Sequence, residues 1–128
     1  MQKEYINENT DRINIYESRI RVLQADSNNN IVIIIDWSEG DPIKMVCEDT
    51  SDITIRLVHN PQFDKEVIGV LEITGFSYIK EGEKYIVQFN FDFNPIGIIR
   101  IKCTKFAFFV SSEPFSMGGN DNRIKQEE

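Results

Sequence analysis

The segment from Tyr85 to Phe93 alternates apolar and polar side chains more regularly than any other part of the chain. On one parity it carries Tyr85, Val87, Phe89, Phe91 and Phe93. The residues between them are polar, apart from Ile86. Because successive side chains of a strand point to opposite faces, this two-residue period predicts a β-strand with one face in a core. The 3.6-residue period that indicates helices is almost absent from the sequence.

Six further segments show strand-like patterns separated by turn-forming residues. The expected strands are residues 13–24, 31–37, 43–47, 53–57, 66–74 and 99–110. The apolar parity changes near Thr104 and between Ile15 and Ile20, and each change requires a bulge or a break. The intervening turns are rich in Asn, Asp, Gly and Pro, as tight turns require. Residues 2–12 could form a short helix.

Seven short strands joined by tight turns predict an all-β protein, either an antiparallel sandwich or a partly open barrel. The length of 128 residues fits one domain that can build a core without disulfides or metals. We place this β domain at residues 1–110. Residues 111–128 contain Pro114, Gly118 and Gly119 and few apolar side chains, which predicts a flexible tail.

The acidic residues are concentrated in one short part of the chain. The formal net charge is −7, and residues 26–52 hold seven acids against one base, Lys44. A negative surface repels nucleic acids and anionic lipids, and it attracts basic proteins. The charge distribution therefore favours a basic protein as the partner, and it argues against nucleic acid and membrane.

Seven residues of this acidic segment are the candidate partner-binding residues, and we expect their carboxylates to gather on one outer face. They are Asp36, Trp37, Glu39, Asp41, Glu48, Asp49 and Asp52. Trp37 shares the parity of Ile33 and Ile35, which places it in the core, but a tryptophan flanked by acids is also typical of interface hot spots. Val32 and Ile34 are apolar on the opposite parity. Strand 31–37 is therefore expected to be covered on both faces, by the fold or by a partner.

No segment has the composition of a signal peptide or a membrane span. The longest aliphatic run, residues 31–35, is far shorter than the ~20 residues of a membrane helix. We therefore expect a soluble cytoplasmic protein in which Cys47 and Cys103 are reduced and buried.

The familiar catalytic and metal-binding patterns are incomplete or absent. Residues 26–30 resemble the start of a calcium loop, but the sixth and twelfth positions are Ile31 and Trp37 instead of Gly and Glu. His59 is the only histidine and lies beside a turn, whereas both cysteines occupy apolar strand positions. Nucleophile-elbow and phosphate-loop motifs are missing. We expect no catalytic residue, metal or cofactor; a carboxylate pair of the glycosidase type within residues 36–52 is the remaining catalytic alternative.

The order of these features resembles that of small bacterial immunity proteins, which neutralise polymorphic or contact-dependent toxins. The resemblance rests on Tyr16 before an Arg19-Ile20 strand, an isoleucine-rich strand that closes in Asp36-Trp37, and the run FNFDFNPIGIIRIKCTKFAFF from Phe89 to Phe109. It covers residues 13–110. The resemblance implies a stoichiometric inhibitor that grips a toxin domain and has no catalytic residues.

Three classes of function are compatible with the sequence. The first is a cytoplasmic binding protein of the immunity type, whose acidic surface meets the basic face of a toxin domain. The second is an enzyme or small-ligand barrel in which Phe89, Phe91 and Phe93 line a cavity. The third is a structural or assembly subunit that associates with copies of itself. We favour the first class, and a homo-oligomer is compatible with it.

Overall fold

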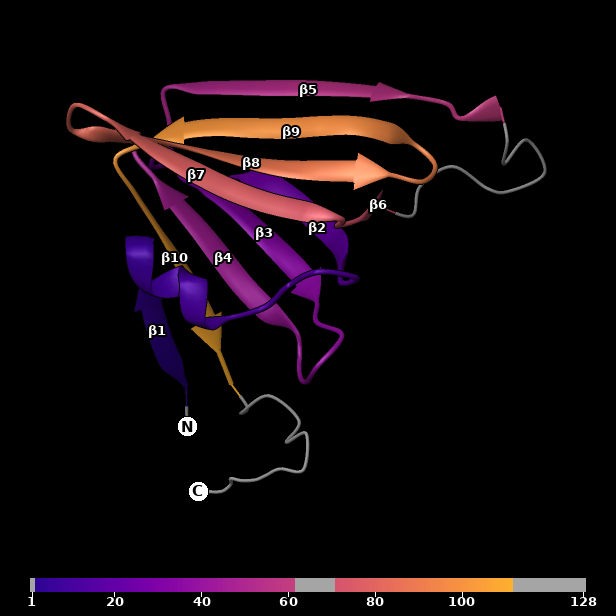
Figure 1. Cartoon of the computed structure of the whole chain (residues 1–128). Coiled ribbons are helices and arrows are strands. Elements are labelled where there is room, and N and C mark those ends of the chain that lie inside the picture. Colours follow the sequence, from indigo (N-terminus) through magenta and orange to yellow (C-terminus); the bar gives the residue numbers. More distant parts are fainter. Residues whose placement is uncertain (1, 62–70, 112–128) are drawn as a thin grey trace.

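Ten strands form two antiparallel sheets that pack face to face in a computed structural model, which describes residues 2–61 and 71–111 (Figure 1). The strands of these ranges are β1 (Lys3–Ile6), β2 (Arg19–Ala25), β3 (Ile31–Asp36), β4 (Ile43–Glu48), β5 (Asp52–Val58), β6 (Leu71–Glu72), β7 (Gly75–Glu81), β8 (Lys84–Asp92), β9 (Ile96–Cys103) and β10 (Lys105–Val110). One 3-10 helix, η1, spans Asn7–Arg12. The predicted all-β sandwich is therefore confirmed.

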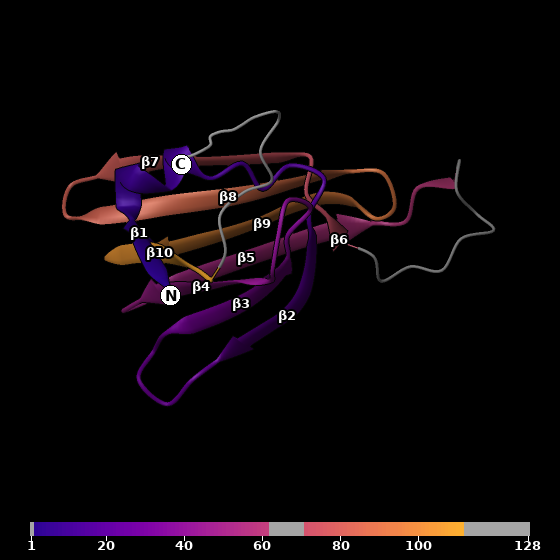
Figure 2. The ribbon, with the colours of Figure 1, turned by 90° about the horizontal axis from the view of Figure 1, so that it is seen from below.

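The two sheets share a corner at which the chain passes from one to the other. The larger sheet has the order β1-β10-β4-β3-β2-β6, and the smaller has the order β5-β9-β8-β7. At the corner β4 leads into β5 and β9 leads into β10, as Figure 1 shows at its upper left and Figure 2 shows from below. Thr104 separates β9 from β10, and its amide donates to the Glu48 carbonyl at 3.0 Å. The predicted break near Thr104 is confirmed, and it is a change of sheet.

The core lies between the sheets and takes one parity of side chains from the central strands. Its largest fully buried side chains are Phe89, Phe91, Phe106, Phe108, Ile15, Ile33, Ile35, Ile43, Met45, Ile73, Ile99 and Ile101. The Phe76 ring packs on Phe89, with 5.1 Å between ring centroids. Phe93 lies beyond the end of β8 and is 48% exposed, so the alternation that begins at Tyr85 stops at Phe91.

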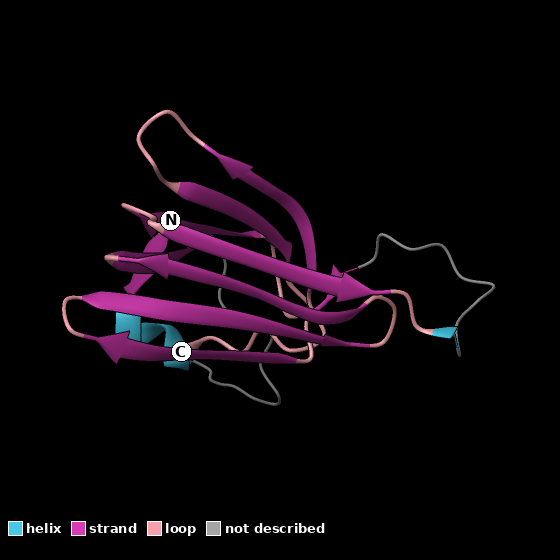
Figure 3. Ribbon diagram, turned by 90° about the horizontal axis from the view of Figure 1, so that it is seen from above, coloured by secondary structure: helices cyan, strands magenta, loops and turns pink. Residues whose placement is uncertain are grey.

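Helix η1 is held against the smaller sheet by two tyrosine–carboxylate hydrogen bonds, and Figure 3 shows it in cyan beside that sheet. The Tyr78 hydroxyl donates to Asp11 at 2.8 Å, and the Tyr85 hydroxyl donates to Glu8. Residues 2–12 thus combine strand β1 with the short helix that their sequence allows. Within the described ranges, no helix has the length and apolar character needed to cross a membrane.

The observed strands differ from the predicted ones at several places. Strands β1 and β7 have no counterpart among the seven predicted strands, and residues 99–110 form parts of two strands instead of one. The predicted strand 13–24 begins at Arg19 in the structure. Ile13 and Ile15 are buried, but they lie in the loop before this strand. Most of the predicted strand 66–74 lies outside the described residues, as does the predicted tail after Ser111.

Candidate partner-binding surface

The β3–β4 hairpin separates the acidic candidates into two groups. Ile35 pairs with Ile43 beside the turn, and β4 runs back from there to Glu48 at the opposite end. Asp36, Glu39 and Asp41 form the turn group, whereas Glu48, Asp49 and Asp52 form the corner group. Five residue steps at about 3.4 Å place about 17 Å between the two ends of β4. The carboxylates therefore form two separate groups, because the extended strand β4 lies between them.

One carboxylate of the turn group has a basic neighbour. The Asp36 carboxylate lies 2.9 Å from Nε of Arg21, and both side chains are about half exposed. Arg21 occupies the bulge at which the β2–β3 register shifts, and it is thereby brought next to Asp36. Burial raises the pKa of Glu39 above its ordinary value, which disfavours its charged form.

Trp37 is a core residue, and this corrects its assignment to the binding surface. The side chain is 6% exposed, and its Nε1–H donates to the backbone carbonyl of Asn14 at 2.8 Å. It continues the inward parity of Ile33 and Ile35, both of which are fully buried. A docking partner would reach Trp37 only by opening the core.

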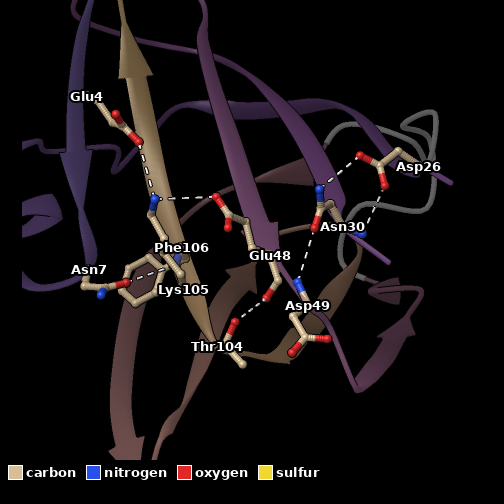
Figure 4. A network of polar contacts seen from close by, with 9 residues as sticks. All are labelled: Glu4, Asn7, Asp26, Asn30, Glu48, Asp49, Thr104, Lys105 and Phe106. Carbon is tan, nitrogen blue, oxygen red and sulfur yellow. Dashed lines mark hydrogen bonds and ion pairs between the residues drawn. The ribbon is translucent and has the colours of Figure 1, made fainter. Parts of the chain in front are cut away.

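At the corner, Asn30 joins the β2–β3 turn to the end of β4 (Figure 4). Its Nδ2 donates to the Asp26 carboxylate at 3.2 Å, and its Oδ1 accepts a bond from the Asp49 amide at 3.2 Å. The amides of Asn28 and Asn30 also donate to Asp26, at 2.7 and 3.1 Å. These backbone hydrogen bonds lower the pKa of Asp26 and keep it ionised. The arrangement fixes the Asp26 carboxylate and holds the backbone of Asp49 beside Asn30.

Lys105 is the basic residue that forms ion pairs at this corner. Its Nζ lies 3.5 Å from a Glu48 oxygen and 3.8 Å from a Glu4 oxygen, and Figure 4 shows it between the two carboxylates. We define the acidic corner as Glu4, Asp26, Glu48, Asp49 and Asp52. Among the described residues, every ion pair of this set involves Lys105. The acidic corner therefore carries a net negative charge.

Two members of the acidic corner lie outside the candidate set drawn from the sequence. Asp26 belongs to the same charge-rich segment, so the charge count includes it. Glu4 reaches the corner because β1 pairs with β10, which places Glu4 opposite Phe109 and near Lys105. No local pattern in the sequence signals that long-range pairing.

A hollow of about 340 Å³ opens beside the acidic corner, between the β2–β3 turn and the start of β5. It is lined by Ala25, Asp26, Asn29, Asn30, Ile31, Thr50, Ser51, Asp52 and Ile53. Two of these residues are carboxylates of the acidic corner. A cationic side chain is therefore the group that fits this hollow best.

The outward side of the larger sheet is mostly apolar in its centre, where Lys44 is the charged residue that lies opposite Ile34 and Phe109. Because directly paired residues share a face, the strand register assigns to it Ile6, Val22, Val32, Ile34, Val46, Ala107 and Phe109, which we call the outer apolar face. All of them except Ala107 are partly exposed. Asp36 and Glu48 share this side and stand at the two ends of the β3–β4 hairpin. The apolar residues on one parity of β3 therefore lie in the core, and those on the other parity lie on the outer apolar face.

His59 lies apart from the two cysteines, which contact each other. His59 is exposed just after β5. Cys47 and Cys103 are buried, as predicted, and form no disulfide. Hydrogen bonding with Cys103 and burial raise the pKa of the Cys47 thiol. In residues 2–61 and 71–111, no three His, Cys, Asp or Glu side chains are placed to hold a metal ion.

Comparison with known proteins finds no matching family model, no matching curated protein and no matching solved structure. The fold and the surface define a class: a two-sheet antiparallel sandwich whose larger sheet presents an apolar face with carboxylates at its ends.

Proposed function

We propose that this protein is a non-catalytic binding protein that blocks a basic toxin domain, in the manner of small bacterial immunity proteins. One observation supports the proposal: the outer apolar face has carboxylates at both of its ends. Protein interfaces combine an apolar centre with a polar rim, and an acidic rim selects a positively charged partner. The two acidic groups thus flank a single surface although they form separate clusters.

The apolar centre supplies most of the affinity in this proposal. Docking removes Val32, Ile34 and Val46 from water, at about 25 cal/mol for each Å² of apolar area that is buried. The rim carboxylates accelerate the encounter and fix the orientation of the partner. Asp36 and Glu48 already have cationic neighbours in Arg21 and Lys105, which reduces the cost of desolvating them.

In this proposal the carboxylates of the acidic corner bind the basic site of the toxin. A nuclease toxin binds phosphate groups through clustered basic side chains. Carboxylates presented at that position occupy the basic site, and the sandwich blocks access to it. The hollow between Asp26 and Asp52 would receive one lysine or arginine of the toxin.

The protein encoded next to this chain in its genome is the partner to test. We expect a one-to-one complex whose association rate falls as ionic strength rises. The I34D variant places a charge in the outer apolar face and should abolish binding. The matched control is I79D, because Ile79 is 59% exposed on the outward side of the smaller sheet. Salt-independent binding would contradict the acidic rim, and equal losses in both variants would contradict the choice of face.

A further inference from the structure

The outer edge of β5 is open in the smaller sheet. β5 pairs with β9 on one side, and none of the described strands pairs with its other side. Figure 1 shows β5 along the upper border of the molecule, with no labelled strand beyond it. Such an edge presents backbone N–H and C=O groups that can accept a further strand.

Apolar side chains are exposed along this open edge. Ile53 is 38% exposed, Ile55 is 54% exposed and Val58 is 61% exposed. In the pairing with β9, Ile55 lies opposite the buried Ile99, so Ile53 and Ile55 belong to the core side of the sheet. They stand at its margin, where the larger sheet leaves them partly uncovered. Another strand at this edge would extend the core over them.

The sequence of β5 is complementary to itself in the antiparallel direction. Residues 52–56 read Asp-Ile-Thr-Ile-Arg, with an acid and a base at equal distances from Thr54. Asp52 and Arg56 are both exposed, and neither makes an ion pair with any described residue. We propose that β5 pairs with β5 of a second copy of this chain, about a two-fold axis through Thr54.

In this arrangement each Asp52 faces Arg56 of the second copy, and each Ile53 faces Ile55. Opposite charges and apolar pairs directly across an antiparallel ladder stabilise it. An axis through Ile55 instead places Asp52 opposite Val58 and Thr54 opposite Arg56. That register lacks the ion pairs, so the charges select the axis at Thr54.

The dimer joins two smaller sheets into one continuous sheet and removes the open edge from both copies. Closed two-fold pairing of this kind is the commonest form of homo-oligomer. The outer apolar face belongs to the larger sheet and stays accessible in the dimer. Asp52 and Ile53 line the hollow and also lie in the dimer ladder, so a toxin side chain and the second copy would compete at that point. The inference goes beyond the proposed function and does not depend on it.

Charge exchange tests the proposal by sedimentation equilibrium over a range of concentrations. The native chain should show a monomer–dimer equilibrium. D52R and R56D each place two like-charged pairs across the axis, and each should raise the dimer dissociation constant about tenfold or more. The double variant D52R/R56D restores opposite charges and should recover dimerisation. A native chain that stays monomeric, or a double variant that dimerises no better than the single ones, would overturn the proposal.

Cross-linking tests the position of the axis. T54C places two thiols directly opposite each other, and copper–phenanthroline oxidation should give a covalent dimer. V58C is the matched control, because Val58 would face Thr50 of the second copy and find no thiol. Both native cysteines are buried and do not compete in the folded protein. Equal cross-linking of the two variants would exclude pairing centred on Thr54, and unchanged melting temperatures would show that both variants are folded.

Discussion

The indole Nε1–H of Trp37 donates to the backbone carbonyl of Asn14 across 2.8 Å, and this bond ties the end of β3 to the loop before β2. The two residues are 23 positions apart in the sequence. Ser38 supports the same junction, because its backbone amide donates to the Ser18 hydroxyl oxygen at 3.0 Å. Trp37, which the sequence also suggested as an interface residue, therefore stabilises the fold from within the core.

Replacing Trp37 should reduce stability without a direct effect on a docking surface. W37F keeps an aromatic ring but removes the N–H, which leaves the Asn14 carbonyl without its donor and a small gap beside the ring. We expect the free energy of unfolding to fall by about 1–3 kcal/mol. Urea denaturation measures this change. A W37F protein as stable as the native one would show that the bond contributes nothing.

The Asp26 carboxylate should contribute a stability term that disappears in acid. Backbone amides of Asn28 and Asn30 lower its pKa below the ordinary value of 3.8. A carboxylate whose pKa is lowered by folding stabilises the folded state above the unfolded pKa, and this contribution is lost as pH falls through the folded pKa. D26N should therefore be less stable than the native chain at neutral pH, and the difference should shrink below pH 3.8. Urea unfolding at a series of pH values gives both curves, and a constant difference would contradict the charge effect.

Gly97 should tolerate no side chain, because β5 passes directly beside it. Its φ is +152°, and a Cβ added there would collide with the Arg56 carbonyl oxygen. G97A should therefore lower the free energy of unfolding by more than about 2 kcal/mol. Gly82 provides the control, since its φ is +64° but a Cβ there meets nothing within 4 Å. G82A should cost only about 1 kcal/mol, and equal losses in the two variants would remove the steric explanation.

Tyr78 should ionise unusually late in an alkaline titration. Desolvation and the hydrogen bond to Asp11 raise its pKa from 10.0 to about 12. A group whose pKa is raised by folding stabilises the folded state below the unfolded pKa, and this contribution is lost as pH rises from 10 to 12. The ultraviolet absorbance of phenolate reports the ionisation. Y78F should remove the latest transition, and its persistence would assign that transition to another tyrosine.

Local periodicity was sufficient to find the central strands and much of the core. Phe89, Phe91, Ile33 and Ile35 are buried because side-chain direction in a strand depends only on sequence position. The parity change near Thr104 revealed a break, but not that the break joins two sheets. That difference depends on which strands pair, and pairing is decided by contacts between distant residues.

The candidate surface was predictable in composition and not in shape. The excess of carboxylates in residues 26–52 is visible in the sequence, but the hairpin that separates Asp36 from Glu48 is a property of the register. The sequence allowed two interpretations of Trp37, a core residue or an interface residue. Its parity with Ile35 favours the core, where the structure places it. Glu4 joins the acidic corner through the β1–β10 pairing, for which no short-range signal exists.

The two acidic groups should contribute unequally to association with the proposed basic partner. E48Q/D49N/D52N and D36N/E39Q/D41N each remove three carboxylates, so their effects on total charge are matched. In the turn group, Arg21 already pairs with Asp36, and burial raises the pKa of Glu39. The corner group lies beside Asp26 and Glu4, and Lys105 is the one base that forms ion pairs within the acidic corner among the described residues.

The corner variant should therefore lose more of the association rate, about tenfold at low ionic strength, than the turn variant. Stopped-flow or surface-based kinetics at several salt concentrations measure the rates, with the chain kept dilute because Asp52 also belongs to the proposed dimer edge. The difference between the variants should vanish at high salt, where screening removes long-range steering. A difference that persists at high salt and lies in the dissociation rate would mean that these carboxylates make direct contacts instead of forming a steering rim.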